Sequence, residues 1–207
     1  MSKILTVDFD IVMSSTIELY NDVIGEFRSM DKILKEYPKI ESILEADLFI
    51  YSELTRYLLY LFKRLSPDKI YFISEHQKIV PIIRDDKDID LINIDHHHDI
   101  GYEGTTINTK IAVPHCGNWV KYLTDLNKIK NYLWIHDDKS LAPRNNLNKG
   151  YLTEDMNIRT CNLYSLGEID KLIICNSPQW IPPNIQALFV TWVGIAEEYY
   201  GRDFKIT

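Results

Sequence analysis

The sequence predicts a single α/β domain over residues 1–207, with three layers: a mainly parallel sheet and helices on both of its faces. Two observations lead to this prediction. Short apolar segments of strand length alternate with longer segments whose apolar residues recur at helical spacing, which is typical of parallel sheets. No internal repeat, low-complexity tract or linker divides the 207 residues, a length that can bury a sizeable core.

Six segments have the apolar content expected of strands that are covered on both faces. The first ends in Asp8 and Asp10, and the third alternates like a strand before it reaches a run of histidines. The predicted strands cover residues 3–10, 69–74, 89–94, 108–114, 131–135 and 171–175.

Four helices are expected from helical spacing and from capping residues. A hydroxyl residue at 14–16 can cap the first, Ser66-Pro67 stops the second, and Pro182-Pro183 starts the last. Residues 141–168, rich in Pro, Asn and Gly, are predicted to be irregular, with room for a short hairpin. The predicted helices cover residues 14–33, 40–65, 117–126 and 184–200, and a short helix or turn is expected after His76.

Composition narrows the class of protein. The net charge is −7 and the chain has no run of lysine and arginine, so a nucleic-acid partner is not expected. The three cysteines have no CxxC spacing, which favours reduced thiols in the cytoplasm. With no signal peptide and no uninterrupted apolar span, no membrane association is expected. The apolar final helix suits a core or an interface equally, so the oligomeric state stays open.

The stretch NIDHHHD, residues 93–99, stands where a buried strand meets a loop. If the strand continues, Asp95, His97 and Asp99 point to one face, and each is about 6.6 Å from the next of the three along the strand. Two carboxylates and an imidazole on one edge can bind one or two divalent cations. The alternative is a solvated polar turn with incidental histidines.

Other predicted strands also end in residues of the kinds that bind metals. All six histidines lie between His76 and His136, and ligands of open α/β sheets bind at the carboxyl ends of the strands. Taken singly, the aspartates fit helix caps and the histidines fit ordinary loop residues; jointly they favour a metal site. These strand-end residues are Asp8, Asp10, His76, Asp95, His97, Asp99, His115, His136, Asp137 and Asp138.

The ligand types indicate the class of metal. Carboxylates outnumber imidazoles and no thiol is placed with them, which suits manganese better than structural zinc. Several carboxylates around one site also suggest two ions that share a hydroxide.

These motifs resemble the arginase (ureohydrolase) superfamily. The block Asp95-x-His97-x-Asp99 looks like the family's Asp-x-His-x-Asp signature, and Asp8-x-Asp10 looks like its paired aspartates. Glu75-His76 looks like the motif that carries its first histidine ligand. The block, the GNW element at residues 117–119 and the SPxWxPP segment at residues 177–183 together resemble one branch of this superfamily. That branch includes peptide arginases, which convert arginine in a peptide to ornithine and urea.

The resemblance implies an arginase-like fold and a site with two Mn²⁺ ions. Asp95 and Asp8 would bridge the ions, His76 and Asp99 would complete one, and His97 and Asp10 the other. A hydroxide acidified by both metals would attack the guanidinium carbon of arginine, in a small molecule or a peptide. His115 would protonate the leaving amine, with His98 and His136 as rivals, and the residue that binds the guanidinium group is not assigned.

One departure concerns chain order. In the family the aspartate pair follows the histidine block, whereas here Asp8 and Asp10 precede it. A circular permutation would explain this order, and coincidence is the alternative.

Two other functions compete with this one. The DHH phosphoesterases also bind two manganese ions and carry an N-terminal Asp-x-Asp, but their first motif differs at the places of Thr6 and Ile11, and they leave His76 and Asp99 without a role. The third hypothesis is a non-catalytic binding module stabilised by metal.

Overall fold

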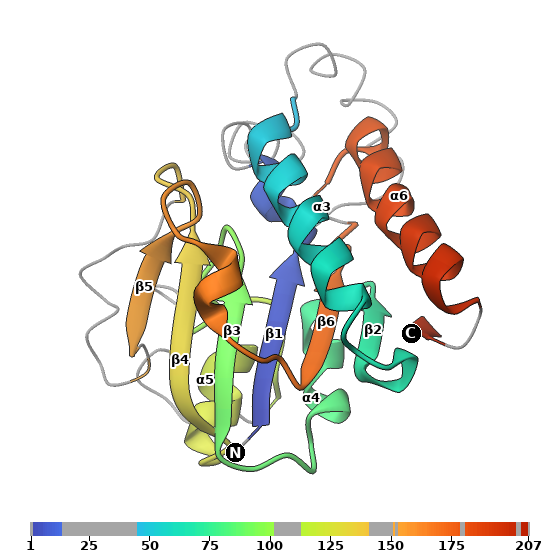
Figure 1. The fold of residues 1–207 in the computed structure, drawn as a ribbon. Helices are drawn as coiled ribbons and strands as arrows, with labels where there is room; N and C mark the ends of the chain where they lie inside the picture. The colour runs from blue at the N-terminus through green and yellow to red at the C-terminus, as the bar shows by residue number, and fades with distance from the viewer. Residues whose placement is uncertain are drawn as a thin grey trace.

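A parallel sheet forms the centre of the molecule (Figure 1). The computed structural model describes residues 2–13, 45–101, 113–140, 151, 153–178, 181–201 and 204–206. Within them, seven strands are hydrogen-bonded in the order β5-β4-β3-β1-β6-β2-β7, and every pairing is parallel. The predicted three-layer α/β class is confirmed. The strands are β1 (Ser2–Asp8), β2 (Ile70–Ile73), β3 (Ile89–Ile94), β4 (Ile129–His136), β5 (Glu154–Asn157), β6 (Lys171–Cys175) and β7 (Lys205–Ile206).

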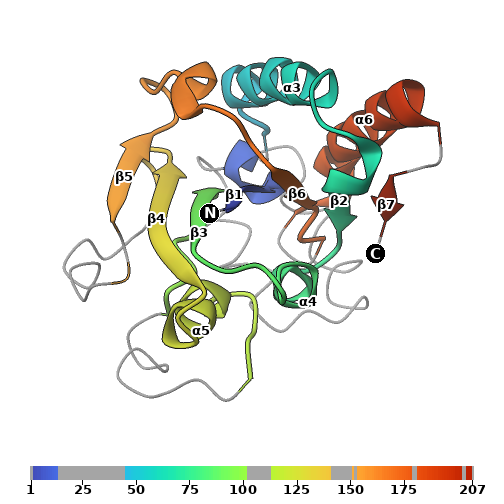
Figure 2. The same cartoon turned by 60° about the horizontal axis from the view of Figure 1, so that its bottom comes forward.

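Helices cover both faces of this sheet. Figure 2 shows α3 and α6 on one face and α4 and α5 on the other. These helices are α3 (Leu48–Phe62), α4 (Ile79–Ile82), α5 (Trp119–Asp125) and α6 (Pro183–Tyr200). Short 3₁₀ turns connect some elements: η1 (Phe9–Met13), η3 (Pro67–Lys69), η4 (His76–Lys78) and η6 (Leu163–Leu166).

Alternation along the strands divides the apolar residues between two cores. In β1, Leu5 and Val7 join the core that contains α3 and α6, whereas Ile4 joins the core that contains α5. Successive side chains of a strand point to opposite faces, so both cores are filled from the same strands. The same alternation directs Asp8 of β1 and Cys175 of β6 to one face, because these two residues are register partners.

Several predicted elements differ in extent. The first strand ends at Asp8, and Asp10 lies in the 3₁₀ turn η1. The second helix begins at Leu48 because the Asp47 carboxylate accepts hydrogen bonds from the backbone N–H groups of Phe49 and Ile50, at 3.1 Å each. The fifth strand is longer than predicted, covering Ile129–His136.

Two strands were not predicted. Residues 154–157 were expected to be irregular or part of a hairpin, but β5 pairs in parallel with β4, which a hairpin cannot do. Its sequence, EDMN, has no apolar run, and β7 has only two residues. The predicted helix 14–33 lies outside the described residues, as does the predicted strand 108–114 except for Val113 and Pro114, which are not in a strand.

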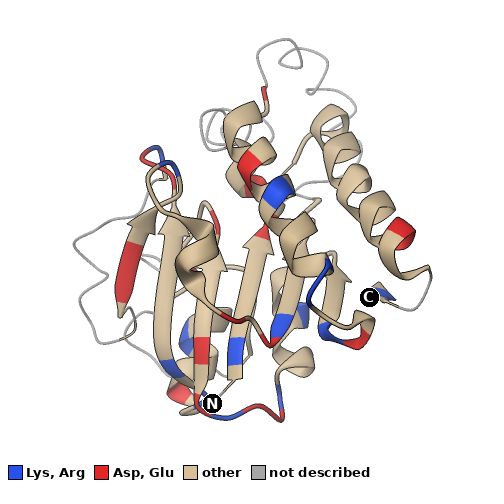
Figure 3. Cartoon of the chain, in the orientation of Figure 1, with Lys and Arg blue, Asp and Glu red and all other residues tan. Residues whose placement is uncertain are grey.

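In β1 and β6, lysines lie near the amino ends of the strands, and an aspartate lies at the carboxyl end of β1 (Figure 3). The lysines are Lys3 and Lys171, and the aspartate is Asp8. None of the described helices combines the length and the apolar character needed to cross a membrane.

Aromatic packing joins α3 and α6 above the sheet. The Trp192 ring is stacked on Tyr51, with 5.6 Å between ring centroids, and makes an edge contact with Phe9 at 4.8 Å. Its indole N–H donates to Thr55 Oγ1 at 2.8 Å. Trp192 of α6 therefore packs against α3 and against the turn η1 that follows β1.

We expect Trp192→Ala to lower the free energy of unfolding by about 3–5 kcal/mol, because it opens a cavity in this core. Urea denaturation would measure the loss. Val190→Ala is the matched control, since Val190 lies on the same helix with 64% of its surface exposed; its effect should stay within about 0.5 kcal/mol. Equal effects of the two variants would contradict the described packing.

Candidate metal centre

The candidate site lies where the direction of the chain through the sheet reverses. From β1 the chain crosses to β2 on one side of the sheet, whereas from β3 it proceeds to β4 and β5 on the other side. The carboxyl ends of β1 and β3 are therefore adjacent at a switch point, the usual ligand site of open α/β sheets. Asp8 and Asp10 thus lie beside the 93–99 block although they are far from it in sequence.

Asp95 is the centre of the site, because its two carboxylate oxygens face two different histidines. Oδ1 lies 3.9 Å from His97 Nδ1, and Oδ2 lies 3.8 Å from His76 Nδ1. Two groups of possible ligands therefore share Asp95, with ligand atoms within 4.8 Å of one another in each group. One group is Asp10, Asp95 and His97; the other is His76, Asp95 and Asp99.

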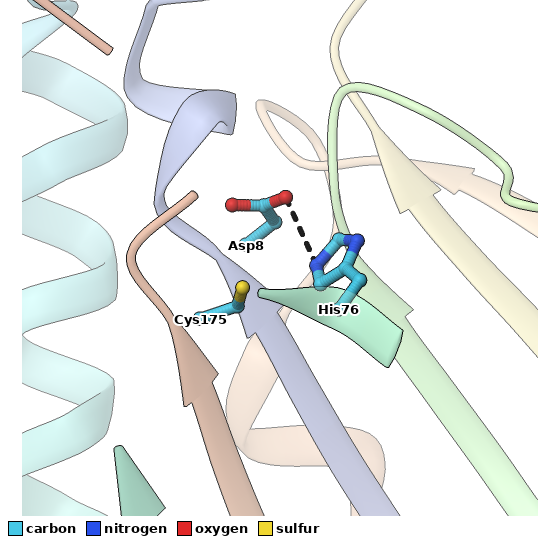
Figure 4. A group of neighbouring side chains, drawn as sticks. All are labelled: Asp8, His76 and Cys175. Carbon is cyan, nitrogen blue, oxygen red and sulfur yellow. Dashed lines mark ion pairs between the residues drawn. The ribbon is translucent and has the colours of Figure 1, made fainter. Parts of the chain in front are cut away.

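Each histidine is also close to a second carboxylate. His97 Nδ1 lies 3.0 Å from Asp10 Oδ2, and His76 Nδ1 lies 2.9 Å from Asp99 Oδ2. The other nitrogen of His76, Nε2, lies 2.9 Å from Asp8 Oδ2 (Figure 4). A third group of possible ligands follows, made of Asp8, His76 and Cys175. Among the described residues only Asp95 belongs to both the His76 and the His97 groups, so a bridging role for Asp8 stays a prediction.

Neutral donors hold the carboxylates in place. Asp8 Oδ2 accepts from the Ser177 hydroxyl at 2.8 Å, and Asp99 Oδ2 accepts from the Trp119 indole at 2.5 Å. These contacts fix one oxygen of each acid.

The carboxylate of Asp95 is held in a similar way. Its Oδ2 accepts from the Asn93 amide at 3.0 Å, while the Asn93 oxygen accepts from the Thr6 hydroxyl at 2.6 Å. The Trp134 indole donates to the backbone carbonyl of Asp95 at 3.0 Å. Sequence reasoning assigned no role to these donors; the polar Thr6 and Asn93 inside apolar strands were the available signal.

Burial and mutual repulsion govern the charges. The pKa of Asp95 is raised well above its usual range by burial and by the neighbouring Asp99 and Asp10. Burial and Asp10 likewise raise the pKa of Asp8. The excess of buried acid is what a bound cation would neutralise.

Asp10 and His97 behave as an ion pair. Burial opposes the charge on Asp10, but its hydrogen bond and attraction to His97 outweigh burial and lower its pKa to about 2. In the same way, burial is outweighed by Asp10 at His97, whose pKa is raised to about 9. One carboxylate is thus compensated by a proton on His97, which a metal ion on this nitrogen would replace.

Two residues at the site have left-handed backbone conformations that non-glycine residues seldom adopt. Asp99 has a φ of 53° and Ser177 a φ of 43°. Both side chains contact the carboxylate–histidine cluster, at Asp99 Oδ2 and at Asp8 Oδ2. Such strain concentrates at functional sites, where surrounding contacts enforce it.

The histidines predicted as proton shuttles lie in three different surroundings. His98 is buried against the Trp134 ring, and burial lowers its pKa to about 4. His115 is exposed in the loop before α5, and no ion pair joins it to the cluster within the described part of the chain. His136 stacks on Trp134 and its Nε2 lies 3.1 Å from Asp155 Oδ2, away from the metal-type groups.

The two aspartates that follow His136 also bind elsewhere. The buried carboxylate of Asp137 accepts from Arg159 Nε at 2.5 Å, and Asp138 accepts a hydrogen bond from Asn157. The predicted site residues that the structure brings together are therefore Asp8, Asp10, His76, Asp95, His97 and Asp99.

The donor set fits divalent cations. Four buried carboxylates surround two imidazoles, and oxygen with nitrogen ligands suits borderline and hard ions. We found no match to this chain among protein-family models, curated proteins or solved structures. The interpretation of the site therefore rests on its own geometry and chemistry.

We expect the chain prepared with manganese to hold about two ions, because two ligand groups share Asp95. Elemental analysis would count them. Bound ions stabilise the folded state by about 2.7 kcal/mol per site at 100 times the dissociation constant, so the melting temperature should rise with added Mn²⁺.

His97→Ala should lose at least one ion and most of the Mn²⁺-dependent rise in melting temperature. His115→Ala is the matched control: this histidine is exposed and lies outside the ligand groups, so the variant should keep both ions. A His97→Ala protein with its full metal content would show that the ligands are misassigned.

Proposed function

We propose that this protein is a metal-dependent hydrolase with two manganese ions, which converts the guanidino group of arginine, free or within a peptide, to ornithine and urea. The observation that supports this most directly is the placement of Asp95, whose two oxygens face His76 and His97. A carboxylate shared in this way is what a pair of adjacent ions requires. The motif resemblance supplies the substrate class.

The described residues would share the two ions as follows. Asp10, Asp95 and His97 would hold one, and His76, Asp95 and Asp99 the other, with Asp8 at the His76 side. When bound, such ions lower the pKa of water and polarise a substrate. The three cysteines are free thiols, which supports a reducing, cytoplasmic location.

The reaction balances with water as the only co-substrate. The water oxygen bonds to the guanidinium carbon, and the bond from that carbon to the side-chain nitrogen breaks. The leaving nitrogen takes a proton and departs as the ornithine amine, while the carbon leaves in urea. A positioned acid is therefore needed beside the leaving nitrogen.

His115 is the proposed proton donor, with His98 as its rival. His115 Nδ1 accepts from the backbone N–H of Gly117 at 3.2 Å, so Nε2 carries the proton in the neutral ring. His98 has the same arrangement, with Ile100 N–H as donor at 3.1 Å, but its ring is buried. Exposure favours His115 because a substrate can reach it.

We expect the manganese-loaded protein to remove CH₂N₂ from arginine-containing peptides, which mass spectrometry detects as the conversion of arginine to ornithine. Free arginine, tested in parallel by urea release, identifies the preferred form of the substrate. His115→Ala should keep its metal and lose about 10²–10⁴-fold in rate, because only proton transfer is removed. A fully loaded protein that hydrolyses no guanidino compound would support the binding module instead.

Asp99→Asn separates the proposal from the phosphoesterase alternative. Asp99 lies 2.9 Å from His76 Nδ1, so its carboxylate either binds the ion or orients the histidine that does. We expect the variant to lose about 10–100-fold or more in guanidino hydrolysis. Assays with a phosphodiester or with pyrophosphate would be run beside it; full activity of Asp99→Asn on those substrates would favour the phosphoesterase.

A further inference from the structure

The end of β6 brings a thiol to the candidate metal centre. Cys175 is the register partner of Asp8 across the β1–β6 pairing, and both side chains are almost fully buried. Figure 4 shows Cys175, Asp8 and His76 converging from three separate segments. One ligand atom from each lies within 4.8 Å of the others. A thiol among carboxylates and an imidazole changes the kind of ion that this side of the centre prefers.

The His76 ring is arranged for binding through Nε2. Its Nδ1 lies 2.9 Å from Asp99 Oδ2, and that oxygen is itself fixed by the Trp119 indole. Histidines that bind metals usually donate their other N–H to a carboxylate in this way. Asp99 therefore orients the ring so that Nε2 faces Asp8 and Cys175.

The Nε2 atom itself lacks a hydrogen bond. It is fully buried, and its contact with Asp8 Oδ2, at 2.9 Å, is an ion pair that is not completed by a regular hydrogen bond within the described part of the chain. Buried polar atoms are rarely left unsatisfied without a functional reason. A cation placed among the three groups would use the lone pair of Nε2 and the charge of Asp8 together.

We propose that the ion on the His76 side is held by Asp8, His76 Nε2 and the Cys175 thiolate, in a position of the zinc type, and that Asp99 orients the His76 ring through Nδ1 instead of binding this ion. The two ions of the centre then occupy chemically different positions. This inference rests on the proposed metal hydrolase and deepens it. Thiolate, imidazole and carboxylate are zinc ligands, and the thiolate selects thiophilic ions such as Zn²⁺ or Co²⁺. The group of Asp10, Asp95 and His97 has only oxygen and nitrogen ligands, which suit Mn²⁺.

Ser177 supports this position from outside. Its hydroxyl lies 3.2 Å from Cys175 Sγ and donates to Asp8 Oδ2 at 2.8 Å. The hydroxyl therefore bridges the thiol and the carboxylate and keeps both on the same side of His76. The backbone of Ser177, just after β6, has a left-handed conformation with a φ of 43° in the arrangement that makes these two contacts.

Cobalt provides a readout that does not depend on activity. Co²⁺ added to the metal-free full-length chain should give a thiolate-to-cobalt charge-transfer band in the near ultraviolet. Cys175→Ser should abolish this band and weaken Zn²⁺ binding by at least tenfold, while Mn²⁺ binding at the other position stays within twofold. Cys161→Ser is the matched control and should keep the band, because Cys161 lies in another part of the fold, 3.8 Å from the Ile158 carbonyl.

The outcomes separate this inference from the proposed function. Two bound ions with no charge-transfer band in the parent would overturn the thiolate position and leave the hydrolase standing. A band that persists in Cys175→Ser would likewise overturn it, since the thiolate would then come from Cys116 or Cys161. No metal bound to the parent under any condition would overturn both proposals. Circular dichroism of each variant, compared with the parent, checks that the fold is kept.

Discussion

Within the described part of the chain, four aspartates lie buried at the carboxyl edge of the sheet and two histidines, His76 and His97, form ion pairs with them. The rest of the site is arranged around this excess of acid. In a low-dielectric interior, like charges at such separations repel strongly, so some carboxylates are held protonated or must be neutralised. Asp10 is compensated by His97, whereas the charge on Asp95 is opposed by burial and by its neighbours. The buried carboxylates of this site therefore need additional positive charge to be stable in their ionised form.

The residues of the site come from two kinds of position in the fold, the ends of strands and the loops that follow them. The sheet fixes Asp8 and Cys175 through strand register, and Asp95 directly follows β3, where its backbone N–H donates to the Ile135 carbonyl at 3.0 Å. The loops after the strands add His76, which forms an ion pair with Asp8, and Asp99, which accepts a hydrogen bond from Trp119 and has a strained backbone. Rigid strands thus set the framework, and the loops supply the ligands that need a particular direction.

Much of this arrangement could be predicted from local patterns. Apolar runs identified β1, β2, β3, β4 and β6, and the polar residues that end the first three of these strands are the ones that meet in space. Roles that depend on strand order could not be predicted, because nothing in a local pattern places β1 between β3 and β6. The expectation that no thiol lies with the carboxylates and histidines was therefore wrong, because the β1–β6 pairing brings Cys175 beside Asp8 and His76.

The errors have a similar cause. His136 seemed equivalent to the other strand-end histidines, but Asp155 binds it, and Asp155 belongs to a strand with no apolar run. An edge strand that pairs on one side only needs little burial, so its sequence carries little signal. The buried Trp119 donates to Asp99, which is 20 residues earlier in the chain, so its role could not be predicted from a local pattern. The buried Asn93 donates to Asp95 only two residues ahead, and its polar side chain in an apolar strand was a local signal.

The central place of β1 also governs when the site can form during synthesis. This strand precedes both of its partners in the sheet, which end at Ile94 and Cys175, and the hydrogen bond from Ser177 to Asp8 joins residues 169 positions apart. Contacts of such long range form late, since loop closure must precede them. A chain still on the ribosome holds the first aspartates long before it holds the residues that flank them. The site therefore closes only after Ser177 has been made, and a shorter nascent chain exposes the first aspartates without the residues that flank them.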